Sequence, residues 1–376
     1  MPHAAFDQRI TDQLAELHDT GQYKRLQTIT GSMGPVVHLK DRGEVIMLCS
    51  NNYLGLADHP EVVQAGIDGL QTYGAGTASV RFICGTFACH ETLERTIARF
   101  IGVQASLTYV SCWNANGALF PTLVGPNDAI FSDALNHASI IDGCRLVHKS
   151  ATRAVYPHND LEDLEAQLKA ARDKDTRWVV TDGVFSMEGD LPPLPGLAEL
   201  CEKYDAMLVV DDSHGTGVLG ERGRGVHEYY QMVDDQGRAR GVDIMTSTLG
   251  KALGGGAGGF VAASDKIIDM LIQRSRPSLF SNALPATVAC SANKAIEIIE
   301  PEPRRVGRLH ENVARVREGL RRLGYDCHDS PTAILPIMIG DTAQAIAKSK
   351  RLLELGVFVI GFGFPVVPKG QARLRV

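Results

Sequence analysis

The stretch Thr246–Phe260 reads Thr-Ser-Thr-Leu-Gly-Lys-Ala-Leu-Gly-Gly-Gly-Ala-Gly-Gly-Phe, and its one lysine, Lys251, lies among small and apolar residues. It follows the strand-like residues Val242, Ile244 and Met245. An amine surrounded by such side chains is partly desolvated, which lowers its pKa and makes it a nucleophile. The stretch therefore predicts a reactive lysine at the end of a buried strand. The plainer interpretation is a lysine that caps a helix beside a flexible loop.

The same residues do not make a nucleotide-triphosphate loop. The pattern Gly-x-x-x-x-Gly-Lys-Ser/Thr needs a glycine where this chain has Met245 and a hydroxyl residue where it has Ala252. The pattern fails at both ends, so the lysine must be explained by other chemistry.

A second group of polar residues follows the apolar run 206–210. The residues Asp211-Asp212-Ser213-His214-Gly215 place two carboxylates and an imidazole at the C-terminal end of a predicted strand, where α/β sheets bind their ligands. A lysine that forms a Schiff base and an aspartate that pairs with a pyridinium nitrogen are the groups that hold pyridoxal 5′-phosphate (PLP). Lys251 and Asp211 therefore predict a PLP site.

A third signal is the predicted strand 105–110, after which Ser111-Cys112-Trp113 opens a helix. The N-terminus of a helix offers free N–H groups and the positive end of a dipole, which suit a phosphate. We assign Ser111, Cys112 and Trp113 to the cofactor phosphate, with ordinary strand-to-helix packing as the alternative.

A serine hydrolase is the rival from another class of enzyme, because Ser213 and His214 are neighbours. A nucleophile elbow reads Gly-x-Ser-x-Gly, and the first position of that pattern is Asp211 here. A non-enzymatic binding protein would not explain why a lysine, an aspartate and a phosphate-type turn all follow predicted strands.

The order of predicted elements indicates an α/β fold. Apolar strands alternate with helical stretches, which is typical of a mostly parallel sheet covered on both faces. The predicted strands are 105–110, 128–132, 178–182 and 206–210, and the helices between them include 161–171 and 194–203. Later helices, 288–299 and 306–323, and strands, 335–339 and 357–360, predict a smaller α+β domain.

The N-terminal part is predicted separately. Phe6, Ile10, Leu14 and Leu17 recur at helical spacing, so we expect an amphipathic helix that lies on a larger body. Residues 36–48 alternate as in a short hairpin. The predicted domains are an arm and hairpin over 1–50, a large PLP-binding domain over 51–285 and a small C-terminal domain over 286–376.

Composition excludes several classes of partner and compartment. The chain has 376 residues and a formal net charge of −6, with no cluster of basic and aromatic residues, so we expect no nucleic-acid partner. No apolar stretch is long enough to predict a membrane span. The eight cysteines form no Cys-x-x-Cys pair, so we expect neither a metal site nor disulfides. The acidic residues among 1–18 do not fit a secretory leader, and we expect a cytoplasmic protein.

Four stretches match, in order, the motifs of one known family: Asn51–Leu56, Ser79–Thr86, Asp133–Gly143 and Thr248–Gly255. In these residues the chain resembles the α-oxoamine synthases, which are fold-type I PLP enzymes. The likeness runs from about Asn51 to the last residue. It implies a large domain with a mostly parallel, seven-stranded-type sheet between helices, and a smaller α+β domain at the C-terminus.

The resemblance implies roles for four catalytic residues. Lys251 would carry PLP as a Schiff base and then act as a base, and Asp211 would keep the pyridine nitrogen protonated. His137, in the Asn-His-Ala-Ser motif, would stack on the cofactor ring. His214 would be the fourth catalytic residue.

The resemblance also implies further cofactor and substrate contacts. Ser186 would bond the phenolic oxygen of PLP, Thr248 would contact the cofactor, and Ser281 would reach the phosphate of the neighbouring subunit in a homodimer with a shared active site. Asn51 and Arg375 would hold the carboxylate of the amino acid. Arg373, on the same strand face, would be a structural residue or a secondary partner.

The activity that the resemblance implies is the condensation of an amino acid with an acyl-CoA. The branch that joins glycine to acetyl-CoA, giving 2-amino-3-oxobutyrate and CoA, resembles the chain most, and a threonine dehydrogenase would be its metabolic neighbour. Gly85–His90 departs from the Gly-Thr-Gln-Asp-Ser-His form expected of that branch. Synthases of 8-amino-7-oxononanoate or 5-aminolevulinate and serine palmitoyltransferase therefore stay open as alternatives.

The family normally continues beyond the arginine that corresponds to Arg375. We therefore expect a chain that is cut at Val376, with Arg375 on a frayed end.

Overall fold

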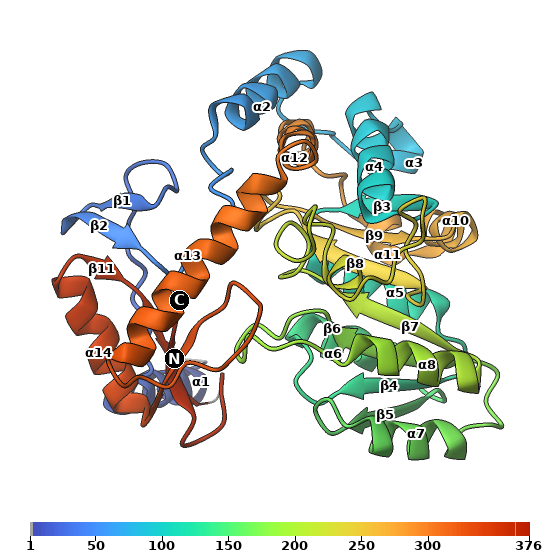
Figure 1. The fold of residues 1–376 in the computed structure, drawn as a ribbon. Coiled ribbons are helices and arrows are strands. Elements are labelled where there is room, and N and C mark those ends of the chain that lie inside the picture. Colours follow the sequence, from blue (N-terminus) through green and yellow to red (C-terminus); the bar gives the residue numbers. More distant parts are fainter. Residues whose placement is uncertain (1–2, 365) are drawn as a thin grey trace. The chain divides into compact units, whose positions relative to one another are not determined.

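The computed structural model describes residues 3–364 and 366–376. Two compact units can be separated in it by the contacts within the chain. The larger unit comprises residues 51–316 and 329–333, and the smaller comprises residues 1–50, 317–328 and 334–376. Figure 1 shows their elements in sequence colours.

The larger unit is built on a seven-stranded sheet, counted over the described residues, in the order β3-β9-β8-β7-β6-β4-β5. Only β9 runs antiparallel to its neighbours, so the sheet is mostly parallel, as predicted. Its strands are β3 (Ala105–Tyr109), β4 (Ala129–Asp133), β5 (Thr152–Tyr156), β6 (Arg177–Asp182), β7 (Ala206–Asp211), β8 (Ile244–Thr248) and β9 (Gly259–Ala263).

Helices cover both faces of this sheet. On one face α5 and α6 pack together, and α7 and α8 pack together on the face turned toward the viewer in Figure 1. The helices of this unit are α2 (Pro60–Tyr73), α3 (Arg81–Cys84), α4 (Ala88–Ile101), α5 (Cys112–Leu123), α6 (Ala138–Arg145), α7 (Leu161–Ala170), α8 (Leu194–Tyr204), α9 (Val226–Tyr229), α10 (Asp265–Arg274), α11 (Arg276–Phe280) and α12 (Ala286–Ile299).

The core of the larger unit lies between the sheet and these helices. Strand β6 is buried along its whole length, and β9 as well, which is typical of strands covered on both faces. A continuous cluster of buried apolar residues joins β3, β4, β7 and β9 to α5 and α10. Burying apolar surface at about 25 cal/mol per Å² makes such a core the main source of stability. This rigid sheet fixes the positions of the polar residues at its edge.

Helix α12 packs on α2 and α4 of the larger unit. Its alanines and isoleucines, such as Ala289 and Ile296, are fully buried. The predicted domain bounds assigned this helix to the small domain over 286–376, whereas the contacts within the chain group residues 286–316 with the larger unit. Small side chains along one helix face allow this close packing. They do not by themselves indicate which unit of the protein the helix packs against.

The smaller unit contains two three-stranded sheets, counted over the described residues, in the orders β1-β2-β11 and β10-β13-β12. The strands are β1 (Val36–Leu39), β2 (Gly43–Met47), β10 (Pro336–Gly340), β11 (Val357–Phe358), β12 (Ile360–Phe362) and β13 (Ala372–Arg375). The hairpin predicted over 36–48 is confirmed by the antiparallel pairing of β1 with β2. Helix α14 (Thr342–Glu354) packs on both sheets, and α13 (Pro303–Arg322) continues from the larger unit.

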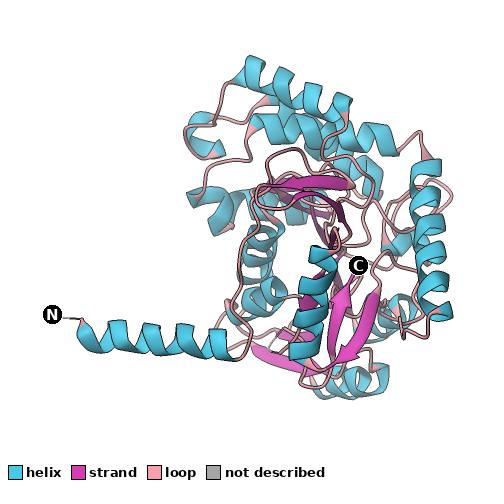
Figure 2. Cartoon of the chain, turned by 90° about the vertical axis from the view of Figure 1, so that its left-hand side faces the viewer, coloured by secondary structure: helices cyan, strands magenta, loops and turns pink. Residues whose placement is uncertain are grey.

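Two expectations about the ends of the chain are wrong. Helix α1 (Ala4–Asp19), all of which the structure describes, buries no residue, and Figure 2 shows it projecting from the strands of its own unit. Its apolar stripe is therefore exposed to solvent, and the exposed fraction of Phe6, for example, is 54%. At the other end, β13 is the central strand of its sheet, and Val376 exchanges backbone hydrogen bonds with Leu335. Arg375 thus lies in a paired strand and not on a frayed end.

Among the described residues, none of the helices combines the length and the apolar character that a membrane crossing requires.

Candidate active site

The predicted site residues of the larger unit gather at one edge of its sheet. Asp211 ends β7, and Lys251 lies in the turn after the neighbouring β8. Ser111 follows β3, and His137 and Ser186 follow β4 and β6. Because these strands run in the same direction, their carboxyl ends share one edge of the sheet, which is where α/β folds bind ligands.

Asp211 is buried, with 4% of its surface exposed, and is held by hydrogen bonds. Its Oδ2 accepts from Asn116 Nδ2 at 2.6 Å and from Cys112 Sγ at 3.5 Å, and its Oδ1 accepts from the backbone N–H of Ser213 at 3.0 Å. The Asn116 amide is itself fixed, because its Oδ1 accepts from Thr246 Oγ1 at 2.9 Å. The carboxylate therefore has one defined orientation at the end of β7.

Two more carboxyl groups lie buried next to Asp211. Asp182 is its partner in the register of β6 and β7, and Asp212 follows it in the chain. Burial, reinforced by the charge of Asp211, raises the pKa of Asp182 well above its usual value. Burial also raises the pKa of Asp212, to about 8, against the hydrogen bonds from Val226 and Thr216. Both groups therefore tend to be protonated and neutral, so Asp211 is not repelled by two neighbouring negative charges.

Lys251 lies in a tightly folded turn between β8 and the antiparallel β9. The Leu249 N–H donates to Gly258 O at 3.0 Å, and Thr248 Oγ1 donates to the same carbonyl at 3.1 Å. The Gly255 N–H donates to Lys251 O at 3.0 Å. Thr248 therefore shapes the lysine turn. Burial is the largest cause of the pKa shifts of Cys112, His137, Asp182 and Asp212, and the charge of Lys251 acts to lower the pKa of each.

The start of α5 meets the end of this lysine turn. Ser111 forms a β-bridge with Gly258, and its Oγ caps the helix by accepting from the Asn114 N–H at 3.1 Å. A side chain at Gly259 would place its Cβ 2.2 Å from the backbone nitrogen of Cys112, so only glycine permits this approach. The helix N-terminus predicted for a phosphate is thereby brought against the turn that carries Lys251.

Cys112 and Trp113 have different surroundings in that first turn of α5. The Cys112 thiol lies near Asp211 and accepts from Ser213 Oγ at 3.4 Å, and burial followed by the Asp211 charge raises its pKa well above the usual value. Trp113 is half-exposed, and its ring lies edge-on to His137 with centroids 6.0 Å apart. Two residues predicted from separate motifs are therefore in contact.

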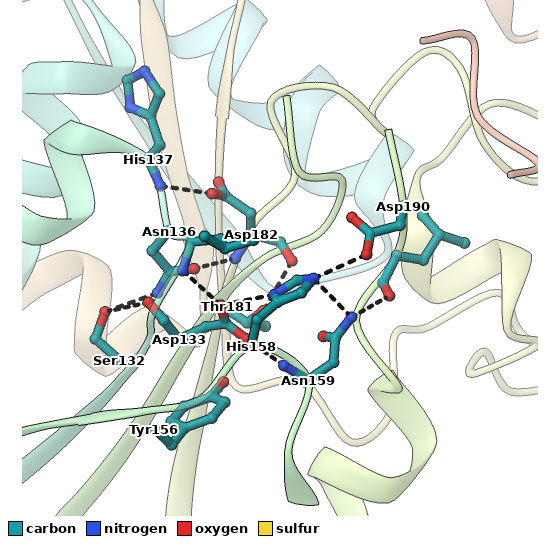
Figure 3. Close-up of polar contacts among 12 residues, drawn as sticks. Ser132, Asp133, Asn136, His137, Tyr156, His158, Asn159, Thr181, Asp182 and Asp190 are labelled. Atoms are coloured by element: carbon teal, nitrogen blue, oxygen red, sulfur yellow. Dashed lines mark hydrogen bonds and ion pairs between the residues drawn. The ribbon is translucent and has the colours of Figure 1, made fainter. Parts of the chain in front are cut away.

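His137 is fixed through its backbone and its ring. Its N–H donates to Asp182 Oδ2 at 2.7 Å (Figure 3), and Nδ1 lies 2.8 Å from Ser139 Oγ. Asn136, just before it, accepts from the Asp182 N–H at 2.8 Å. Partial burial lowers the pKa of His137, and the Lys251 charge acts in the same direction against Asp211. A ring with a lowered pKa is mainly neutral near pH 7, which suits stacking on a flat cofactor.

His214 and Asn51 are brought together by a residue that sequence reasoning missed. Tyr53 Oη lies 2.7 Å from His214 Nδ1 and donates to Asn51 Oδ1 at 3.3 Å. Tyr53 and His214 are 161 positions apart, so no local pattern could reveal the contact. The signal that was available is a tyrosine in the polar turn of a motif that already carried an assigned asparagine.

Asn116 and Asp182 were missed as well. Asn116 is fully buried in α5, and the signal for it was a second amide, after Asn114, in a mostly apolar helix. Asp182 is the last residue of the buried strand β6, and its position at a strand end was the same signal that identified Asp211.

Ser186 and Ser281 lie at other places in the larger unit. Ser186 is partly buried in the turn between Phe185 and Asp190, where the Gly189 N–H donates to Phe185 O at 2.7 Å. Ser281 follows α11 and lines a small cavity of about 20 Å³ together with Arg81 and Asn114.

Arg375 belongs to the smaller unit and is described there by itself. It is 7% exposed on β13, where it pairs in register with Pro336 and Ile360. Arg373, two residues earlier, is 1% exposed, and its Nε donates to Gln371 O at 3.0 Å. Arg373 therefore supports the segment before the strand.

No group of three or more His, Cys, Asp or Glu side chains in residues 3–364 and 366–376 is arranged to hold a metal ion.

Known proteins resemble the chain over nearly its whole length. The model of the family "Aminotransferase class I and II" matches residues 43–376. The 2-amino-3-ketobutyrate coenzyme A ligase of Escherichia coli K12 is 46% identical over 372 residues, which covers 98% of this chain and 92% of the relative. The 8-amino-7-oxononanoate synthase of Geobacter sulfurreducens is 44% identical over 368 residues, covering 97% and 92%.

A solved structure with the same fold is a serine palmitoyltransferase of S. paucimobilis that has PLP and myriocin bound. It aligns with a TM-score of 0.90 at 29% identity, over 99% of this chain and 92% of that one. The match spans both units, so the predicted fold-type I architecture is confirmed. The chain belongs to the class I and II aminotransferase family and, within it, to the α-oxoamine synthases that its motifs predicted.

Proposed function

We propose that this chain is a PLP-dependent acyltransferase that joins glycine to acetyl-CoA, giving 2-amino-3-oxobutyrate and free CoA. The observation that carries the proposal is the buried, hydrogen-bonded carboxylate of Asp211 at the end of β7, with Lys251 in the turn after the adjacent β8. The 46% identity with the E. coli 2-amino-3-ketobutyrate coenzyme A ligase supports this choice of substrates.

The residues at the sheet edge fit PLP. The buried Asp211 carboxylate suits a protonated pyridine nitrogen, and the amine of Lys251 suits the aldehyde carbon. The capped start of α5, with Ser111, Cys112 and Trp113, suits the phosphate. We assign Thr248 and Ser186 to the remaining cofactor contacts and His137 to the face of the ring. PLP supplies an electron sink that makes the α-carbon of a bound amino acid acidic.

The protein's own groups then have separate tasks. With PLP bound, Lys251 Nζ would take the α-proton of glycine, and Asp211, at the end of the neighbouring strand, would keep the pyridine nitrogen protonated. Asn51 and His214, joined by Tyr53, form a polar wall beside the site. The α-carbon bonds to the acetyl carbon of acetyl-CoA, and the thiolate of CoA leaves with a proton.

The test of the function is a substrate screen with free-thiol release as the readout. Glycine, alanine and serine are each paired with acetyl-CoA and with longer acyl-CoAs. We expect glycine with acetyl-CoA to be the best pair. Preference for pimeloyl, succinyl or palmitoyl thioesters would move the chain to another branch, and thiol release that is equal with and without added PLP would exclude the proposed function.

The substrate screen varies the length of the acyl group because one motif of this chain differs from the form expected of acetyl-transferring members. Phe87 stacks on Tyr73, with ring centroids 5.2 Å apart, and on His90 at 5.7 Å. This aromatic stack occupies the stretch Gly85–His90, in which the chain departs from the form expected of acetyl-transferring members. Because an 8-amino-7-oxononanoate synthase is 44% identical to this chain, a longer acyl group is the second candidate for the transferred group. The relatives give no support to a serine hydrolase.

We assign the carboxylate of glycine to Asn51 and Arg375. A guanidinium offers two parallel donors that a lysine cannot reproduce. Arg375→Lys should raise the KM for glycine at least about tenfold, which is roughly 1.4 kcal/mol of binding, with an unchanged cofactor spectrum. Steady-state kinetics with varied glycine check this. Arg373→Lys is the control and should stay within about twofold of wild type. An unaltered KM in Arg375→Lys would move the assignment elsewhere.

The assembly and setting of the enzyme also belong to this proposal. We expect a homodimer in which Ser281 serves the active site of the neighbouring subunit. The described cysteines are all unpaired, which supports a reducing compartment such as the cytoplasm.

A threonine dehydrogenase would form the same amino ketone from threonine. The present enzyme, running in reverse, would then cleave that ketone with CoA to give glycine. Addition of the dehydrogenase with threonine, NAD and CoA should yield glycine, and failure to do so would remove the coupling.

A further inference from the structure

One partly buried histidine has no part in the proposed chemistry. His158 follows β5, and each nitrogen of its ring contacts a carboxylate: Nδ1 lies 3.0 Å from Asp133 Oδ1, and Nε2 lies 2.9 Å from Asp190 Oδ2 (Figure 3). Burial alone would lower the pKa of His158, but hydrogen bonds to the two carboxylates outweigh it and raise the pKa to about 10. The ring is therefore an imidazolium at neutral pH and donates in both directions.

The two carboxylates come from the two loops that carry site residues. Asp133 ends β4, and its other contacts are the N–H groups of Leu135 at 2.8 Å and Asn159 at 2.9 Å. The chain then runs directly to Asn136 and His137. Asp190 ends the turn that begins at Phe185 and contains Ser186. The bridge Asp133–His158–Asp190 thus joins the His137 loop to the Ser186 turn.

Other contacts hold the same turn on its far side. The ring of His158 meets Phe185 edge-on, with centroids 4.4 Å apart. The carbonyl of Gly189 accepts from Thr332 Oγ1 at 2.6 Å and from Ser330 Oγ. The turn is therefore fixed at both its first residue and its last two. The His158 contacts connect it to the strand that leads to His137. Asn159 makes a second connection, because its N–H donates to Asp133 Oδ2 at 2.9 Å and its Nδ2 donates to Leu191 O, just after the turn, at 3.1 Å.

We propose that His158 is a positioning residue that fixes the Ser186 turn against the His137 loop, so that both site residues keep one geometry. This rests on the proposed function, because it takes Ser186 and His137 to face the same cofactor. Hydrogen bonds to charged groups are stronger than neutral ones. The bond to Asp133 is largely buried, whereas the Asp190 side chain is 37% exposed. A neutral side chain in place of the imidazolium cannot reproduce both.

The test compares His158→Gln with wild type and with two controls. His148→Gln changes an exposed histidine whose Nδ1 lies 2.8 Å from Ser150 Oγ. Leu168→Ala changes a fully buried residue of α7 and lowers stability without touching either loop. Hydrogen–deuterium exchange of the PLP-free proteins should show residues 183–190 opening at least about tenfold faster in His158→Gln alone. Exchange of this segment within twofold of wild type would overturn the proposal.

The second readout is the absorption spectrum of added PLP. We expect His158→Gln to shift the bound-PLP band in the same direction as Ser186→Ala, and the double variant to shift it no further than Ser186→Ala does. Leu168→Ala and His148→Gln should keep the wild-type band. Faster exchange with an unchanged band would make His158 merely structural and refute the positioning role. A wild-type protein that takes up no PLP would instead refute the proposed function, and the exchange result alone would then decide whether the bridge fixes the turn.

Discussion

Replacing Lys251 by alanine should abolish the condensation of glycine with acetyl-CoA. The variant loses the amine that holds PLP and the base that takes the α-proton, so we expect kcat to fall at least about a thousandfold. Wild-type protein should be yellow with PLP, and borohydride should fix the cofactor on the peptide that contains Lys251. The variant should show neither the colour nor the labelled peptide.

The control for this prediction is Lys266→Ala, which removes an exposed lysine of α10 and should keep full activity. Label on a different lysine, or a yellow and active Lys251→Ala protein, would contradict the PLP site.

The same variant can test the shared site. In a homodimer whose sites combine Lys251 of one chain with Ser281 of the other, a hybrid of Lys251→Ala and Ser281→Ala chains has one intact site. Random mixing should then leave about a quarter of all sites intact. Activity no higher than that of the Ser281→Ala component, together with a monomeric mass in solution, would argue against the dimer.

The strand ends of the site could be predicted because each apolar run stops at a polar residue. Asp211 was found in this way, whereas the role of His137 came from the resemblance of its Asn-His-Ala-Ser motif to a known family. The parallel order of the strands places both at one edge. Strand β9 was not predicted, because its first residues lie in a glycine run that looks like a loop. The close approach of Gly259 to Cys112 explains one of those glycines, and that contact joins positions 147 residues apart in the sequence, as 259 − 112 = 147.

Partners across the sheet could not be predicted from local pattern. Periodicity reports which residues are buried, and not which groups they meet. The contact of Asp182 with the His137 backbone and the contact of Tyr53 with His214 both join segments far apart in the chain. The exposed stripe of α1 shows the same limit, since an apolar face predicts a partner without identifying one.

Asp211, which ends β7, and Asp212, which follows it, should respond to the same substitution in opposite ways. Asp211→Asn replaces a carboxylate by an amide of the same shape. The amide oxygen can still accept from Asn116, but a neutral group cannot keep the pyridine nitrogen protonated. We expect kcat to fall at least about a hundredfold, or roughly 2.7 kcal/mol, with a shifted spectrum of bound PLP.

Asp212→Asn is the matched control, because the burial that raises the pKa of Asp212 to about 8 already makes this group mainly neutral at pH 7. Its Oδ2 accepts from Thr216 Oγ1 and from the Val226 N–H, both at 3.1 Å, and an amide oxygen can accept both. Three glycines surround the carboxyl group, and a Cβ at Gly225 would lie 1.9 Å from Oδ2, so the cavity admits an isosteric side chain and little else. The variant should therefore keep kcat within about threefold of wild type. Steady-state kinetics and the PLP spectrum of both variants at pH 7 decide the matter: equal losses would mean that general disturbance of the strand end, and not the charge of Asp211, governs the activity.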